Sequence, residues 1–279
     1  MHWTDRLEIL IERAQDTELQ RRAALLYRAL VKALDKPIEA VLMRSRQTGH
    51  MVFRIRPFGR VSGVRDARHL ALDVPVRHDQ TSLWPLERPE GITRYVLTWR
   101  PTIVYLPRGT TSLGQVSIRE LRELLSRAVV QDREKLMHEL THFIDIVRLG
   151  KERWRAADRG YKTDTEDLER YANHPIELNA YYQQIAAAER EDFDIALNGD
   201  DPVWDLWQWA DFDVKEAVGR FTSKIQRHIW QQMTEKNKRR FRKRAAMFYD
   251  EIRQQAREKL HELAADGDED AQYALADMS

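Results

Sequence analysis

The chain has 279 residues, enough for one sizeable hydrophobic core and a second, smaller one. Its 46 basic residues nearly balance its 45 acidic residues, and this balance excludes a globally basic nucleic-acid binder but not a local basic surface. The absence of cysteine excludes disulfides, cysteine-ligated metal sites and thiol catalysis.

The N-terminal residues carry charges every few positions and lack the apolar core of a signal peptide. We find no run of about 18 apolar residues, the length needed to span a bilayer. We therefore expect a cytoplasmic protein with no membrane partner.

Helical and strand-like patterns occupy different parts of the chain and predict an α+β fold. Apolar residues at helical spacing predict a helix over residues 3–34, within an N-terminal helical segment 1–48. Residues from about 50 to 107 form short runs rich in β-branched and aromatic side chains, separated by Gly, Pro and Asp. Such runs are typical of strands. These runs are MVFRIRPF, HLALDVPV, RYVLTW and TIVYLP, and we expect them to form a small twisted sheet.

Two helices are predicted after this sheet. Ser117 and Glu120 have the spacing of a capping box, which opens the first helix at Ile118. The second helix is expected over residues 130–149, with Gly150 as its C-terminal cap.

The rest of the chain is predicted to be largely helical. Residues 151–173 are polar and poorly periodic, which favours a loop containing a short helix, and Pro175 opens a helix to about residue 190. Asn-Gly and Asp-Pro pairs indicate a boundary over 196–205. A helical extension is expected over 203–264, followed by an acidic tail, 265–279.

The residues His138-Glu139-Leu140-Thr141-His142 match the pattern H-E-x-x-H. On a helix His138 and His142 share one stripe with Asp145, and their spacing lets both imidazoles reach one tetrahedral zinc ion. Glu139 lies on the flank, where it can act as a general base toward a water molecule. The apolar residues of the opposite side are Leu136, Met137, Leu140, Phe143, Ile144 and Val147. The competing interpretation is an amphipathic helix with two non-ligating histidines.

A catalytic zinc site needs a third protein ligand. A third histidine six residues after His142 is excluded, because Arg148 stands there, and a cysteine ligand is excluded by composition. Glu177, on the helix that begins at Pro175, is the candidate, and His174 is the alternative third ligand.

HELTH followed by a helix containing E-x-x-A-Y resembles the zincin fold in its gluzincin form, and is similar to compact intracellular or phage-type members. The resemblance covers about residues 95–190 and implies a zincin-like catalytic domain over 49–195. It further implies that zinc is held by His138, His142 and Glu177, and that Glu139 is the general base.

This chain departs from the best-known gluzincin pattern after the glutamate. Ile176 precedes Glu177, and Tyr181 stands where that pattern has an aspartate. Another group must then orient a ligand histidine, and Asp145 is the candidate. Tyr181 is the candidate for stabilising the transition state, as the tyrosine predicted to share a side of its helix with Glu177.

A dense basic stretch follows in the C-terminal extension, KNKRRFRKR over 236–244. It favours contact with nucleic acid or another acidic partner, although a solvated helix surface or neutralisation by nearby acidic stretches has the same pattern. The candidate contacts are Lys238, Arg239, Arg240, Arg242, Lys243 and Arg244.

Taken together, these patterns predict a zinc-dependent peptidase that acts on a protein or peptide substrate. The alternative is a non-enzymatic helical protein that binds DNA, RNA or a protein partner through 236–244 and carries structural metal or none. The sequence alone leaves both open.

Overall fold

The computed structural model describes the chain in nine stretches. They are residues 3–35, 41–45, 51–55, 70–76, 82–88, 91–101, 112–158, 168–199 and 202–278, with the backbone alone for 3–16, 82–95 and 149–158. Two compact units divide the chain, Met1–Gly160 and Tyr161–Ser279. In the stretches that are described, none of the helices combines the length and the apolar character needed to cross a bilayer.

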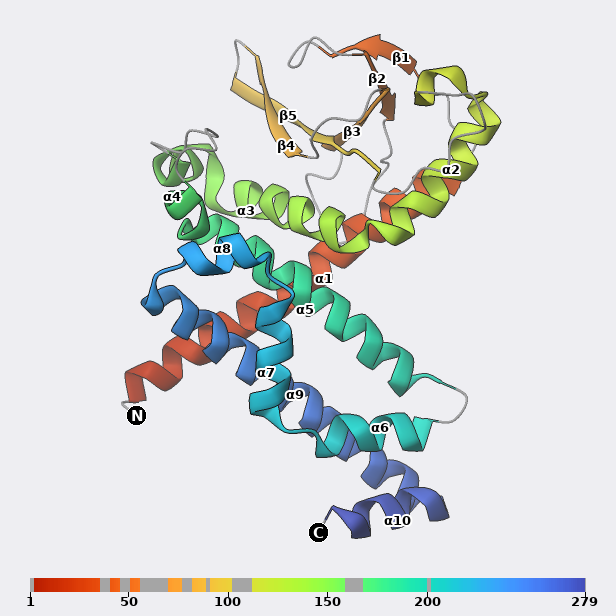
Figure 1. The fold of residues 1–279 in the computed structure, drawn as a ribbon, viewed down its shortest axis with the longest axis vertical. Coiled ribbons are helices and arrows are strands. Elements are labelled where there is room, and N and C mark those ends of the chain that lie inside the picture. The colour runs from red at the N-terminus through yellow and green to blue at the C-terminus, as the bar shows by residue number, and fades with distance from the viewer. Residues whose placement is uncertain are drawn as a thin grey trace. The chain divides into compact units, whose positions relative to one another are not determined.

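The first unit contains a five-stranded mixed sheet, which together with its helices makes the fold α+β as predicted (Figure 1). The strand order is β1-β2-β3-β5-β4, with β3 and β5 parallel and all other neighbours antiparallel. The strands are β1 (Val41–Arg44), β2 (Met51–Ile55), β3 (Leu70–Pro75), β4 (Ser82–Arg88) and β5 (Gly91–Thr98).

The central strand β3 is buried along its whole length, as its run of apolar residues requires. Its one charged residue, Asp73, is 1% exposed and accepts two hydrogen bonds of 2.7 Å from Arg54 on β2. This forked pair compensates the cost of burying a carboxylate, and the hydrogen bond to Asp73 raises the pKa of Arg54.

Two helices follow the sheet, after the short 3-10 turn η2 (Leu113–Gln115): α2 (Ile118–Gln131) and α3 (Arg133–Asp158). The predicted capping box of α2 is confirmed, since Ser117 N–H donates to the Glu120 carboxylate at 3.0 Å and Glu120 N–H donates to Ser117 Oγ at 3.3 Å. These bonds satisfy backbone donors that the first turn of a helix leaves unpaired.

Two hydrogen bonds tie the start of α3 to the residues that follow β5. The Trp99 indole N–H donates to the Asp132 carboxylate at 2.9 Å, in a buried position. One turn later, Lys135 Nζ donates to the carbonyl of Arg100 at 3.0 Å. With α3 also packed against β4 and β5, its N-terminal half is held in place by the sheet.

The opening helix α1 (Trp3–Asp35) packs along α2 and α3. Its described inner face is a leucine-rich stripe at helical spacing, and Tyr27 donates a hydrogen bond of 3.0 Å to the carbonyl of Val129 on α2. The buried residues of this stripe are Leu19, Ala23, Leu26, Leu30 and Leu34.

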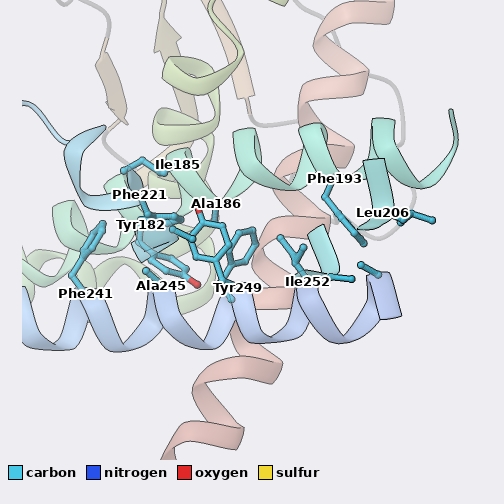
Figure 2. Close-up of a cluster of buried hydrophobic side chains, with 14 of the residues drawn as sticks. Tyr182, Ile185, Ala186, Phe193, Leu206, Phe221, Phe241, Ala245, Tyr249 and Ile252 are labelled. Carbon is cyan, nitrogen blue, oxygen red and sulfur yellow. The ribbon is translucent and has the colours of Figure 1, made fainter. Parts of the chain in front are cut away.

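In the described part of the second unit, every secondary-structure element is a helix. Its core lies between α5 and α9, with aromatic and small side chains from both helices interlocked, as Figure 2 shows for Tyr182, Ala186, Tyr249 and Ile252. Its helices are α4 (Leu168–Ala172), α5 (Pro175–Leu197), α6 (Pro202–Asp211), α7 (Val214–Ser223), α8 (Arg227–Gln232), α9 (Glu235–Ala265) and α10 (Glu269–Asp277).

Most predicted elements are confirmed with changed ends. The helix at the N-terminus, the helix opened at Pro175 and a short helix within 151–173 are all present. The predicted strand runs at 51–58, 69–76 and 94–99 correspond to β2, β3 and β5, whereas TIVYLP lies outside the described residues.

Two predictions were wrong. The segment 1–48 is not helical throughout, because Val41–Arg44 pairs with β2 as an edge strand. Gly150 does not end α3, which continues to Asp158. A glycine inside a helix costs only about 1 kcal/mol relative to alanine, so it does not terminate a helix whose flanking residues favour continuation.

The division between the two units also differs from the boundary inferred over 196–205. The compact units divide at 160/161, and α5 belongs with the C-terminal helices because it packs against α6 and α9. Helices α5 and α6 thus share one core, although the predicted boundary falls between them.

The Trp99–Asp132 hydrogen bond predicts a measurable effect on stability. Trp99→Phe removes the indole N–H while keeping an aromatic ring, and we expect the free energy of unfolding to fall by about 1–3 kcal/mol because a buried carboxylate loses a donor. Urea unfolding followed by circular dichroism measures this change. Trp204→Phe is the matched control at a side chain that is 61% exposed, and it should change stability by less than about 0.5 kcal/mol. Equal effects of the two substitutions would contradict an anchoring role for Trp99.

Candidate metal centre

His138 and His142 lie on successive turns of α3, and their rings converge. The two Nε2 atoms are 3.2 Å apart, and the rings are nearly perpendicular, with centroids 4.8 Å apart. Two nitrogens bound to one tetrahedral zinc at about 2.1 Å would be separated by about 3.4 Å. The two imidazoles therefore hold their nitrogens close to the spacing that a single metal ion requires.

The helix that carries the histidines is buried on more than one side. The apolar side predicted from the sequence is confirmed: Leu136, Met137, Leu140, Phe143 and Ile144 are buried, and Val147 is half-buried. The polar stripe is buried as well, with His138 and His142 each 8% exposed and Asp145 5% exposed. Between them, Thr141 donates a hydrogen bond of 2.8 Å to the carbonyl of Met137, which satisfies its buried hydroxyl.

Glu177 completes a group of three buried residues that can hold a metal ion. One ligand atom each from His138, His142 and Glu177 lie within 4.8 Å of one another. Two imidazole nitrogens and one carboxylate oxygen are a donor set that suits a divalent ion, and a cation would compensate the cost of burying the carboxylate. These three residues could therefore hold a metal ion.

The position of Glu177 follows from the local sequence. Pro175 is the first residue of α5, where its missing N–H costs no hydrogen bond, and Glu177 lies in the same first turn. A carboxylate is favoured there by the positive end of the helix dipole. His174 is the N-cap residue of α5 and makes no capping hydrogen bond through its side chain. Among the residues that the structure describes, the metal-ligand group contains Glu177 and does not include His174.

Glu139 is half-exposed on α3 and lies one turn after Lys135. The pKa of Lys135 is lowered, mainly because the ammonium group is partly buried. Repulsion from Arg100 also lowers this pKa, whereas attraction to Asp132 and to Glu139 raises it. The general-base candidate thus has a cationic neighbour on its own helix. The i, i+4 spacing of Lys135 and Glu139 is the sequence signal that indicates this neighbour.

Tyr181 lies one turn after Glu177 on α5, and its hydroxyl is 3.1 Å from the hydroxyl of Tyr171. The two rings meet edge to face, with centroids 6.2 Å apart, and both side chains are half-buried. The sequence placed both tyrosines near the glutamate helix but did not indicate that their hydroxyls would pair. Tyr182, by contrast, is a core residue between α5 and α9.

The basic stretch 236–244 forms the beginning of α9, and its side chains divide into two kinds. Lys238 pairs with Glu235 at 3.0 Å, and the Arg244 guanidinium lies over the Tyr182 ring, 3.8 Å from its centroid. The other candidate contacts, Arg239, Arg240, Arg242 and Lys243, are exposed, and the Arg242 guanidinium also lies over the Trp230 ring, 5.2 Å from its centroid.

Comparison with known proteins gives no family: no protein-family model, curated protein or solved structure matches the chain. The function must therefore be inferred from the residues of the site.

The three-residue group predicts a specific pattern of metal affinities. We expect zinc to bind with a stoichiometry of about one per chain. Loss of a residue that only hydrogen-bonds to a ligand weakens metal affinity by about 10–100-fold. Loss of a ligand should weaken it further, so we expect a larger effect from each of the substitutions His138→Gln, His142→Gln and Glu177→Gln. Competition titration with a chromogenic chelator measures these affinities.

His174→Gln separates the two candidate third ligands, and the exposed His261→Gln is the control. Both variants should bind zinc as the wild type does. Weakened binding in His174→Gln together with unchanged binding in Glu177→Gln would reverse the assignment of the third ligand.

Proposed function

We propose that this protein is a zinc-dependent peptidase of the gluzincin type. The observation that carries the proposal is the buried group of His138, His142 and Glu177, next to which the chain places Glu139. Two histidines and a glutamate, with a further glutamate directly after the first histidine, are the residues that the resemblance to gluzincins implies.

The number of protein ligands favours catalysis over a structural role. Structural zinc sites are closed by four protein ligands, whereas catalytic sites use three and leave a position for water or substrate. The metal-ligand group found in the described part of the chain has three members. When bound, zinc would polarise the carbonyl of the substrate and lower the pKa of a water molecule.

Glu139 is the proposed general base. On the helix its side chain leaves about 100° from His138 and about 60° from His142, and its half-exposed position is accessible to water. Its carboxylate accepts a proton from the attacking water and then donates that proton to the amine nitrogen released when the peptide bond breaks. Lys135, one turn earlier on α3, places a positively charged side chain near this carboxylate.

Tyr181 is the proposed donor to the oxygen of the substrate carbonyl. This oxygen gains negative charge in the transition state, and a phenol O–H directed at it would stabilise that charge. The hydroxyl of Tyr171, 3.1 Å from that of Tyr181, restricts the orientation of this donor. Asp145, buried three residues after His142, is proposed to orient that imidazole.

Replacing the general base should separate metal binding from catalysis. Glu139→Gln keeps the size of the side chain but cannot accept the proton, so we expect cleavage of fluorescently labelled denatured casein to fall by about 100- to 10,000-fold while zinc content stays at the wild-type value. The matched control is Glu134→Gln on the same helix, where the carboxylate is exposed, and its activity should equal that of the wild type.

The same assay distinguishes the enzyme from the alternative of a non-enzymatic binding protein. A chelator should abolish cleavage by the wild type, and added zinc should restore it. A wild type with one zinc per chain that leaves the casein mixture intact would contradict the peptidase and favour structural metal. A wild type that binds no zinc would contradict the metal centre itself.

Tyr181→Phe tests the proposed donor. We expect kcat to fall by about 100- to 1000-fold, with zinc affinity unchanged, because the missing hydroxyl acts mainly in the transition state. Steady-state kinetics on the best peptide found in the casein digest measures kcat and KM separately. Tyr171→Phe should have a smaller effect. An unchanged kcat in Tyr181→Phe would exclude Tyr181 from the catalytic machinery.

A further inference from the structure

The first two turns of α9 present a basic surface that the proposed peptidase does not use. Its four residues, Lys236, Arg239, Arg240 and Lys243, follow the spacing i, i+3, i+4 and i+7 and fall within an arc of about 100°. All four are exposed. We refer to this set as the basic face of α9.

The scaffold under this face is rigidly packed. The opposite side of the same turns carries Phe241, Ala245 and Phe248, which are buried in the core with Tyr182 and Phe221, and Figure 2 shows Phe241 and Ala245 within that core. At the start of α9, the Thr234 side chain caps the helix, and Asn173 accepts a hydrogen bond of 2.7 Å from Thr234 N–H. The four cations therefore project from a backbone that is fixed within its unit.

The remaining basic residues of the stretch have structural contacts. Arg244 lies over the Tyr182 ring and donates to Asn179 at 3.1 Å, and Arg242 lies over the Trp230 ring, 5.2 Å from its centroid. Lys238 binds the carboxylate of Glu235, and this hydrogen bond is the main reason why the pKa of Glu235 is lowered. Glu235 thus binds Lys238 on the flank of the basic face, and its carboxylate also attracts Arg242 and Arg239 more weakly.

The charge pattern changes farther along α9. Asp250 follows Lys243 by seven residues and pairs with Arg253 at 2.8 Å, so the positive surface is confined to about the first two turns. From Lys236 to Lys243 it extends about 10 Å along the helix axis. This length covers about three successive phosphates of a nucleic-acid strand, given a rise of about 3.4 Å per phosphate.

We propose that the basic face of α9 binds the phosphate backbone of nucleic acid. Nucleic acid is favoured over an anionic membrane because helices that bind membranes present apolar side chains beside their basic ones, whereas the apolar side of α9 is in the core. The side chains of the basic face contact phosphate oxygens, so binding is independent of base sequence and depends strongly on salt.

Fluorescence anisotropy with labelled 20-nucleotide single- and double-stranded DNA tests this proposal on the full chain. With about three phosphate contacts, we expect the logarithm of the association constant to fall against the logarithm of salt concentration with a slope of about −2 to −3. Affinity should therefore weaken by about 20- to 40-fold between 50 and 200 mM KCl. No binding at 50 mM KCl, or a slope near zero, would overturn the proposal.

A charge-matched pair of variants locates the surface. Replacing Lys236, Arg239, Arg240 and Lys243 with glutamine should weaken binding at 50 mM KCl by at least about 10-fold and flatten the salt slope. Replacing Arg119, Arg127, Lys215 and Arg220 with glutamine removes the same charge from exposed positions elsewhere and should leave both values unchanged. Equal losses in the two variants would overturn the assignment to α9.

A charge-preserving variant and two other anionic partners provide further tests of the proposal. Arg239→Lys with Arg240→Lys preserves charge and should preserve binding, which keeps the assignment testable if the glutamine variant does not fold. Co-sedimentation with phosphatidylserine vesicles, or binding to poly-glutamate without binding to DNA, would overturn nucleic acid as the partner. Glu139→Gln should bind DNA as the wild type does, because Glu139 is not part of the basic face. The nucleic-acid proposal can therefore be tested even if the protein has no peptidase activity.

Discussion

The separation of 3.2 Å between the Nε2 atoms of His138 and His142 is the constraint on which the metal centre depends. His138 and His142 lie one helical turn apart, so this spacing depends on the regular geometry of α3. The anchors at the start of α3, from Trp99 to Asp132 and from Lys135 to Arg100, hold this helix against the end of β5. The sheet therefore contributes to the site indirectly, by fixing the helix that carries both imidazoles.

Helix α5 has a comparable double role in the second unit. Its first turns carry Glu177 and Tyr181, while Tyr182, Ile185 and Ala186 bury another side of the helix against α9 and its neighbours. A carboxylate in the first turn of such a packed helix has little freedom to relax toward water. Burying a carboxylate costs free energy, and a bound cation is one way to offset that cost.

Much of this arrangement could be predicted from the sequence, because local patterns encode it. The H-E-x-x-H spacing, the capping box at Ser117 and the proline at the start of α5 each depend on residues within one or two turns. The features that could not be predicted depend on tertiary packing. The pairing of the Tyr171 and Tyr181 hydroxyls, the strand at Val41–Arg44 and the continuation of α3 beyond Gly150 have no strong local signal. The grouping of α5 with the C-terminal helices likewise reflects a shared core rather than the Asn-Gly and Asp-Pro pairs that follow it.

X-ray absorption at the zinc edge, on wild-type protein loaded with one zinc per chain, tests the assignment of the three metal ligands. We expect scattering from two imidazole rings with Zn–N distances of about 2.0–2.1 Å, together with oxygen ligands at about 2.0–2.2 Å. One imidazole should disappear in His138→Gln, and the oxygen scattering should change in Glu177→Gln while both imidazoles remain. A spectrum of the wild type without two imidazoles, or one that neither substitution alters, would contradict the assignment of His138, His142 and Glu177 as the metal ligands.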